Sequence, residues 1–367
     1  MRRGLPGVSR RKLGAGSRKP DSFTAGTIGA MNEVHVLVAQ RFPEPLVDRL
    51  RAVSTLLKVH LHPARTSEEL PADVLPDVEV LYTWRALPEP EAVPNLRWIQ
   101  FHLSGIDEMA NHPLVRSGVA VTTLSGANTP QMAEYALMAI LALARRVPAL
   151  MREKDQKKWA ADPHDRFRPT DLRGSTVGIV GYGSIGRELA RLCRALGAHI
   201  LAVKRNLKDL QDEGYLADGL GDPRGDLAER IYPPQALRSM ASLCDFLVIC
   251  TPLTPETRGS VSQAVLETMK PTAFLIDISR GGVVDHGALV EALAQNRLAG
   301  AALDVFPVEP LPESSPLWEM PNVLLSPHIA GASPRYYEQA AELFAQNLRR
   351  YLSDQPLLNR YDPARGY

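Results

Sequence analysis

The stretch T-V-G-I-V-G-Y-G-S-I-G-R-E-L-A-R-L, Thr176–Leu192, decides the fold. A short apolar run leads into three glycines, and a segment with helical spacing follows at once. In such a unit the first glycine allows a tight turn, the second lets a pyrophosphate approach the backbone, and the third lets helix and strand pack closely. Free N–H groups at the helix start face the anion. We therefore predict a Rossmann domain that binds a dinucleotide through the loop Gly181, Tyr182, Gly183, Ser184, Ile185 and Gly186.

Apolar, β-branched segments alternate with helix-length segments on both sides of this stretch. The strand candidates before it are residues 34–39, 56–61, 78–82, 98–101 and 119–124, and those after it are residues 199–204, 246–251, 273–278, 301–305 and 323–325. The alternation predicts two doubly wound α/β units with parallel sheets. Residues 206–232 are polar and rich in glycine and aspartate, which predicts a surface loop.

Two helical segments suggest how the chain divides into domains. Gln131–Val147 is apolar nearly all round, which predicts a buried helix between the two α/β units. Pro334–Leu352 is amphipathic and no strand follows it, so it can return to the first unit. We expect a discontinuous, flavodoxin-like substrate domain, an active site in the cleft between the domains, and a polar arm at 151–174. The expected bounds are 31–128 with 331–367 for the substrate domain and 129–330 for the dinucleotide-binding domain.

The composition indicates an ordinary globular protein, with 45% hydrophobic and 23% charged residues. The net charge is only +1, and residues 1–30 hold seven basic residues and one acid, so the rest of the chain is mildly acidic. Nucleic-acid binding needs clustered cations, which this body lacks. The longest uncharged apolar run has 10 residues, too few to span a bilayer. We expect neither a nucleic-acid nor a membrane partner.

The basic tail, residues 1–30, lacks the apolar core of a secretory signal. It is interpreted as a disordered extension, or as sequence upstream of a true start at Met31; an organellar transit peptide is less favoured because of its glycines and prolines. The three cysteines, Cys193, Cys244 and Cys250, have no metal-binding spacing. Buried free thiols indicate a reducing, cytoplasmic location, and no metal site is expected.

The end of the next strand indicates the cofactor. An acid at this point usually binds the adenosine ribose diol. Here Lys204 and Arg205 occupy it, and two cations attract a 2′-phosphate. This pair predicts NADP(H), with NAD(H) as the alternative if both side chains face solvent.

Three ionisable residues follow later strands, where open α/β sheets bind ligands. Arg280 lies in D-I-S-R-G-G, Glu309 in V-F-P-V-E-P, and His328 in L-S-P-H-I-A-G. Each alone has an ordinary structural explanation. Their combination at one sheet edge beside a dinucleotide predicts a catalytic site.

From Met31 onward the chain resembles the D-isomer-specific 2-hydroxyacid dehydrogenase family. The segment H-L-S-G-I-D at 102–107 resembles the family's substrate-carboxylate loop, and the cations after the second strand resemble the NADP-using glyoxylate/hydroxypyruvate reductase branch. The remaining motifs are T-P-L-T-P-E-T-R-G at 251–259, S-R-G-G-V-V-D at 279–285, A-A-L-D-V-F at 301–306, E-P-L-P at 309–312 and S-P-H-I-A-G at 326–331.

The resemblance implies reduction of a small 2-oxo acid to a D-2-hydroxy acid by a homodimer. It implies that His328 is the acid–base, that Glu309 bonds its other ring nitrogen, and that Arg280 grips the substrate carboxylate and polarises the carbonyl. The remaining implied cofactor contacts are Thr251, Pro252, Ile278, Asp304 and Gly331, and the implied substrate contacts are Leu103, Ser104 and Gly105. Trp84 and Arg85 follow a strand and form either a substrate lid or a surface loop.

A rival function keeps the same fold without useful turnover. A dinucleotide-sensing regulator that acts through a protein partner is compatible with the same three ionisable residues. Steady-state reduction of glyoxylate with NADPH distinguishes the two, because a sensor binds cofactor without consuming it.

Overall fold

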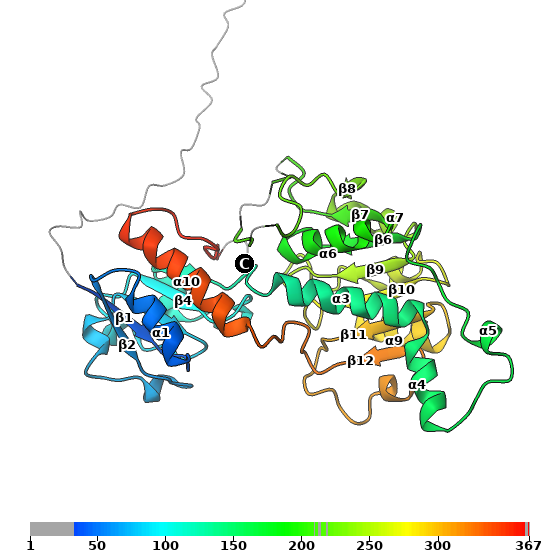
Figure 1. Cartoon of the computed structure of the whole chain (residues 1–367), viewed down its shortest axis with the longest axis horizontal. Coiled ribbons are helices and arrows are strands. Elements are labelled where there is room, and N and C mark those ends of the chain that lie inside the picture. The colour runs from blue at the N-terminus through cyan, green and yellow to red at the C-terminus, as the bar shows by residue number, and fades with distance from the viewer. Residues whose placement is uncertain (1–32, 209, 212–213, 218, 364–365, 367) are drawn as a thin grey trace, which may run out of the picture. The chain divides into compact units, whose positions relative to one another are not determined.

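The computed structural model describes residues 33–208, 210–211, 214–217, 219–363 and 366. The basic tail predicted at 1–30 lies outside these residues. The described strands form two sheets, and every neighbouring pair of strands is parallel (Figure 1). The prediction of two parallel-sheet α/β units is confirmed. None of the described helices has the length and hydropathy needed to cross a membrane.

The smaller sheet has five strands in the order β2-β1-β3-β4-β5. The order changes direction between β1 and β3, as in flavodoxin-like sheets. Every residue of β3 and β4 is buried, which accounts for their mostly apolar sequences. The bounds are Val34–Val38 (β1), Leu57–Leu61 (β2), Val80–Thr83 (β3), Trp98–Phe101 (β4) and Ala120–Thr122 (β5).

One face of this sheet is covered by α1 (Glu44–Arg51) and α10 (Tyr336–Leu352) (Figure 1). Phe344 of α10 is fully buried, with its ring centroid 4.7 Å from that of Tyr82 and 5.3 Å from that of Trp98. The helix near the end of the chain therefore completes the core of the first sheet. The opposite face is covered by loops and by short helices, Pro113–Arg116 (α2) and the 3₁₀ turns Ser67–Glu69, Leu75–Asp77, Pro90–Ala92 and Asp107–Met109.

The larger sheet has seven strands in the order β12-β11-β10-β9-β6-β7-β8. Its order changes direction between β6 and β9, and ligands bind at the carboxyl ends of the strands beside such a point. The bounds are Thr176–Val180 (β6), His199–Val203 (β7), Arg230–Tyr232 (β8), Phe246–Ile249 (β9), Phe274–Asp277 (β10), Gly300–Leu303 (β11) and Val323–Leu325 (β12).

Helices cover both faces of this sheet. On one face, α3 (Thr129–Ala144) and α6 (Ser184–Ala195) pack side by side (Figure 1). The other face carries α7 (Leu237–Ala241), α8 (Gln263–Leu266) and α9 (His286–Ala294). Two 3₁₀ turns, Pro234–Ala236 and Pro316–Glu319, lie in the connections.

Three segments differ from the sequence expectations. The loop expected at 206–232 ends in the edge strand β8, which is too short to give an alternating pattern. The arm expected at 151–174 contains the end of α4 (Val147–Asp155) and α5 (Pro163–Arg166). The helix α3, expected to be buried, buries only one face, because Met138 and Leu141 on its other face are 44% and 37% exposed.

Candidate active site

The dinucleotide loop follows β6 and opens α6, as predicted. Gly181 has φ +106°, and a Cβ there would lie 2.9 Å from the Cys250 backbone. A Cβ on Gly186 would lie 2.3 Å from the Gly181 carbonyl oxygen, so the helix and the loop touch there. At Gly183 a Cβ would meet nothing within 4 Å, which leaves open space at the α6 N-terminus. These features fit a pyrophosphate on the loop.

Tyr182 belongs to this loop, but its side chain faces the protein interior. It is 2% exposed, and its hydroxyl donates to Asp222 at 2.7 Å. The guanidinium of Arg187, which is fully buried, lies over the Tyr182 ring and donates to the Asp222 carbonyl oxygen. The Asp222 carboxylate also accepts the backbone N–H groups of residues 225–227. This buried network holds the β7–β8 connection against α6.

The two cations predicted to select NADP(H) lie directly after β7. Lys204 is half-buried, and its backbone N–H donates to the carbonyl oxygen of Tyr232 in β8 at 3.1 Å. Arg205 is exposed. Glu256 lies in the loop after β9, within electrostatic reach of Arg205. A hydrogen bond from Thr254 and, more weakly, the Arg205 charge lower the pKa of Glu256. An acid therefore accompanies the cations at this edge.

His328 and Glu309 form a pair. The Nδ1 atom of His328 lies 2.8 Å from Glu309 Oε2, and the other carboxylate oxygen accepts the Phe306 N–H at 3.0 Å. The two side chains are 44% and 37% exposed, so they are open to a small ligand. With Nδ1 engaged, Nε2 of His328 is left for proton transfer.

Asp304 follows β11 and binds the turn that carries His328. Its carboxylate accepts the Ser326 hydroxyl at 2.6 Å and the N–H groups of Ile329 and Ala330, both at 2.8 Å. His328 itself has φ +53°, an unusual conformation for a side chain of its size. Asp304 is 1% exposed, and these bonds hold the turn in that conformation. The Ser326 hydroxyl also contacts that of Tyr135 on α3.

Arg280 follows β10, and its turn packs against the segment that leads to Glu309. A Cβ on Gly281 would lie 1.9 Å from the Phe306 carbonyl oxygen, so the two backbones touch. Arg280 also reaches the loop after β4, where its Nε lies 3.5 Å from Asp107 Oδ2. The structure thus links Arg280, the Glu309–His328 pair and the predicted substrate loop through direct contacts.

The predicted substrate loop, Leu103–Gly105, is partly exposed. The backbone N–H groups of these three residues donate to no part of the chain that the structure describes, so they are available to an anion. The residue before them, His102, is 5% exposed, and burial lowers its pKa to about 4. Its Nδ1 shares a hydrogen bond of 2.5 Å with the Tyr82 hydroxyl, and burial raises the pKa of Tyr82, so two neutral groups meet there.

A second buried carboxyl, Asp277 at the end of β10, supports the Arg280 turn. Its Oδ1 accepts the Ser279 N–H at 3.0 Å and the Ser279 hydroxyl at 2.5 Å. Burial raises the pKa of Asp277 to about 7, and the negative charge of Asp304 acts in the same direction, against the Ser279 hydrogen bonds. Asp277 did not emerge from the sequence analysis, although it lies three residues before Arg280.

The remaining predicted residues lie around this edge. Arg85 contacts the Trp84 ring, with its guanidinium 5.1 Å from the ring centroid, and pairs with Glu108 at 3.0 Å, beside the substrate loop. Thr251 and Pro252 follow β9 and are half-exposed. Ile278 is 2% exposed and belongs to the core, so only its backbone can face a ligand.

Gly331 packs against the start of α3, where a Cβ would lie 2.7 Å from Asn128 Nδ2. Within the described part of the chain no three His, Cys, Asp or Glu residues are placed to hold a metal ion. Sequence reasoning missed Asp107, Asp222 and Tyr135. Their partners are 173, 40 and 191 residues away, and no local pattern reports such distant contacts.

Residues 137–330 match the family model described as D-isomer specific 2-hydroxyacid dehydrogenase, NAD binding domain. A glyoxylate reductase of Thermococcus gammatolerans is 33% identical over 85% of this chain and 91% of its own length. The chain belongs to the D-isomer specific 2-hydroxyacid dehydrogenase family. It is therefore an oxidoreductase with a dinucleotide-binding domain.

Solved structures of the family have the same fold. A D-isomer specific 2-hydroxyacid dehydrogenase of Xanthobacter autotrophicus Py2, in complex with NADPH and MES, is 29% identical with a TM-score of 0.74, covering 92% of this chain and 100% of that one. An NADPH-dependent glyoxylate/hydroxypyruvate reductase of Sinorhizobium meliloti, in complex with NADP and malonate, is 29% identical with a TM-score of 0.67, covering 90% and 98%. The resemblance inferred from the motifs is confirmed.

Proposed function

We propose that the chain is an NADP(H)-preferring, D-specific reductase of small 2-oxo acids, with glyoxylate and hydroxypyruvate as its best substrates. The observation that carries this proposal is the Glu309–His328 pair, held on a turn bound by Asp304 at the ligand edge of the larger sheet. The similarity to glyoxylate reductases supports the substrate class. When bound, a nicotinamide dinucleotide would supply the hydride.

The residues of this chain supply binding and the proton. Arg280 and the free N–H groups of the Leu103–Gly105 loop hold the substrate carboxylate. Arg280 also polarises the carbonyl to be reduced. His328 Nε2 then donates a proton to the carbonyl oxygen while C2 receives the hydride, and Glu309 fixes the ring tautomer through Nδ1.

The decisive assay measures turnover of glyoxylate, hydroxypyruvate, pyruvate and a bulkier 2-oxo acid with NADPH and with NADH. We expect turnover of the first two. His328→Asn should keep NADPH affinity but lose about 10²–10⁴ in kcat. NADPH binding without turnover of any 2-oxo acid contradicts this proposal and favours the regulatory alternative, which the comparisons do not support.

For the cofactor preference, we propose that Lys204 and Arg205 bind the 2′-phosphate. Each charge-assisted hydrogen bond contributes about 1.5–3 kcal/mol, reduced by exposure and by added salt. Changing both to Ala should raise the KM for NADPH at least about tenfold and leave that for NADH nearly unchanged. Glu256→Gln removes the negative charge that acts on Arg205, so it should lower the KM for NADPH. Equal use of both cofactors by the wild type contradicts the preference.

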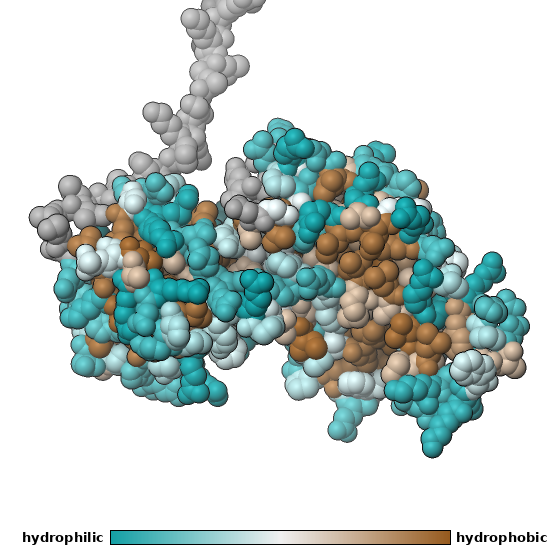
Figure 2. Space-filling view, in the orientation of Figure 1, coloured by the Kyte–Doolittle hydropathy of each residue, from teal (hydrophilic) through white to brown (hydrophobic). Residues whose placement is uncertain are grey.

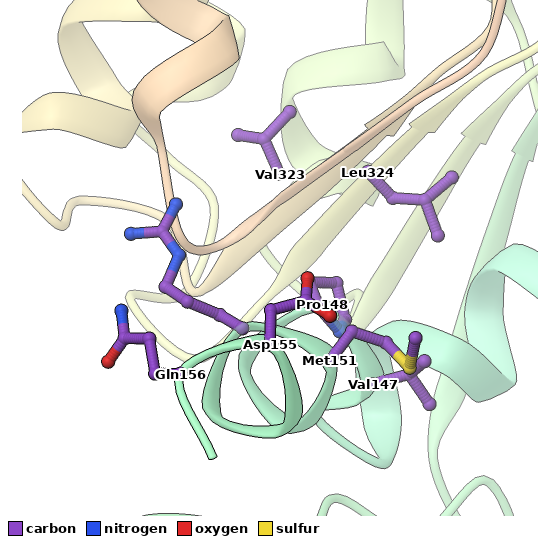
Figure 3. A pocket seen from close by; sticks show the side chains of 8 residues that line it. Val147, Pro148, Met151, Asp155, Gln156, Val323 and Leu324 are labelled. Carbon is purple, nitrogen blue, oxygen red and sulfur yellow. The ribbon is translucent and has the colours of Figure 1, made fainter. Parts of the chain in front are cut away.

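We also propose that the protein is a homodimer that uses the apolar face of α3 and α4, formed by Met138, Leu141, Leu150 and Met151. These side chains are 37–46% exposed. Figure 2 shows apolar residues gathered on the unit that holds the larger sheet, over the region where α3 lies in Figure 1. Between α4 and the edge strand β12 there is a cavity of about 410 Å³, lined in part by Pro148, Met151 and Val323 (Figure 3). Trp159, 94% exposed on the arm, offers a further apolar contact.

Light scattering tests the dimer. Leu141→Glu with Met151→Glu should yield a monomer, whereas Leu243→Glu, at a 49% exposed position elsewhere, should not. A monomeric wild type contradicts the assembly. We also propose that the chain divides into a substrate domain, 31–128 with 331–367, and a dinucleotide-binding domain, 129–330. We propose a cytoplasmic location as well, which the free thiols of Cys193, Cys244 and Cys250 support.

A further inference from the structure

Two arginines reach the predicted substrate loop, and each is paired with an acid from the residues that follow that loop. Arg280 pairs with Asp107 at 3.5 Å, and Arg85 pairs with Glu108 at 3.0 Å. Asp107 and Glu108 open a 3₁₀ turn two residues after Gly105. The pair with Arg280 matters more for chemistry, because Arg280 is the proposed carboxylate anchor.

The guanidinium of Arg280 is engaged on two of its three nitrogens. Nε faces Asp107, and Nη1 donates to the Ser279 carbonyl oxygen at 2.9 Å. Nη2 lies over Gly105, where a Cβ would be only 2.7 Å away. Gly105 does not have a positive φ, and the nearest atom to such a Cβ is the end of the Arg280 side chain itself. The remaining nitrogen, Nη2, therefore lies beside the substrate loop at Gly105.

We propose that Asp107 is a positioning residue for Arg280. It holds the guanidinium plane so that Nη2 meets the carboxylate of a 2-oxo acid bound to the 103–105 loop. The pair is 34% and 37% exposed, so it stabilises the fold little. Its effect is on binding, because ordering a long side chain on ligand binding costs up to about tenfold in affinity, and Asp107 removes that cost beforehand.

The proposal rests on the proposed function, so its test includes binding as well as turnover. The probe is oxamate, an unreactive analogue with a carboxylate next to an amide carbonyl, titrated by calorimetry into protein saturated with NADPH. Asp107→Ala should weaken oxamate binding and raise the KM for glyoxylate by about three- to tenfold, with a smaller change in kcat. Asp107→Asn keeps a side chain of the same size with a polar oxygen for Arg280 Nε, and it should restore most of the loss.

The matched control is Asp48→Asn, which removes an exposed partner of Arg51 at 2.9 Å on α1; it should change neither quantity. NADPH affinity should stay constant in all variants. The proposal is overturned if Asp107→Ala leaves oxamate affinity unchanged or if the Ala and Asn variants lose the same amount of oxamate affinity. It is also overturned if the wild type binds no oxamate. Oxamate binding without turnover of any 2-oxo acid contradicts the proposed function alone.

Discussion

Replacing Asp304 by Asn tests how the His328 turn is held. The two carboxylate oxygens accept three hydrogen bonds, from the Ser326 hydroxyl and from the N–H groups of Ile329 and Ala330. An amide has only one oxygen. In either orientation its NH₂ group faces a backbone N–H, and the side chain is only 1% exposed, so water cannot replace the lost acceptor.

The structure sets the size of this effect. Losing one charge-assisted hydrogen bond and leaving a buried N–H unpaired costs about 2–3 kcal/mol in the free energy of unfolding. His328 would also lose the bonds that hold its turn at φ +53°. A displacement of about 1 Å of a catalytic group costs up to about 10² in rate, so kcat should fall about ten- to a hundredfold.

Urea unfolding followed by tryptophan fluorescence measures the stability, and steady-state reduction of glyoxylate measures kcat. Asp171→Asn, which removes an exposed partner of Arg145, is the matched control and should change stability by less than about 0.5 kcal/mol. The argument is wrong if Asp304→Asn changes the free energy of unfolding and kcat as little as this control does. If Asp304 served only the cofactor, the KM for NADPH would rise while stability stayed constant.

Three further predictions concern buried groups and the dinucleotide loop. Asp277 has a folded pKa of about 7 against an ordinary value of 3.8, so its own contribution to the free energy of unfolding should be lost as pH rises between these values. Between pH 4 and pH 8, urea titrations of Asp277→Asn should show about 2–4 kcal/mol less of this loss than the wild type. His102 has a folded pKa of about 4 against 6.5, so its own contribution to the free energy of unfolding should be lost as pH drops through that interval. His102→Gln should remove this contribution from the acid-unfolding curve, and an unchanged slope would assign the loss to other groups. Gly183→Ala should leave the unfolding midpoint unchanged, since a Cβ there meets nothing within 4 Å, but should weaken NADPH binding at least about tenfold in a fluorescence titration; unchanged affinity would place the pyrophosphate elsewhere.

Most strands could be predicted from the sequence because they are buried on both faces and form continuous apolar runs. The strands at 98–101 and 323–325 have the predicted bounds. The strand β8 could not be predicted, because only three residues pair along one edge and Arg230 is exposed. Local sequence holds no signal when pairing depends on a neighbour already in place.

The site divides in the same way. Arg280 and His328 follow strands in recognisable motifs, so sequence placed them at the ligand edge. The contacts that position them were not visible, because Asp107 reaches Arg280 from the 3₁₀ turn after β4 and Tyr135 reaches the His328 turn from α3. These contacts are set by tertiary packing rather than by spacing along the chain. The buried side chain of Tyr182 was equally unforeseen within a loop expected to face a ligand.

The position of α10 has a consequence for synthesis on the ribosome. Leu343, Phe344 and Leu348 are fully buried in the core of a sheet whose strands lie between residues 34 and 122. That sheet emerges first, yet its core stays open until about two hundred later residues have been made. The core of the larger sheet extends only to Ala330, a few residues past β12. The second unit should therefore become protease-resistant before the first during translation. Nascent chains arrested before residue 336 should expose the apolar face of the first sheet to chaperones.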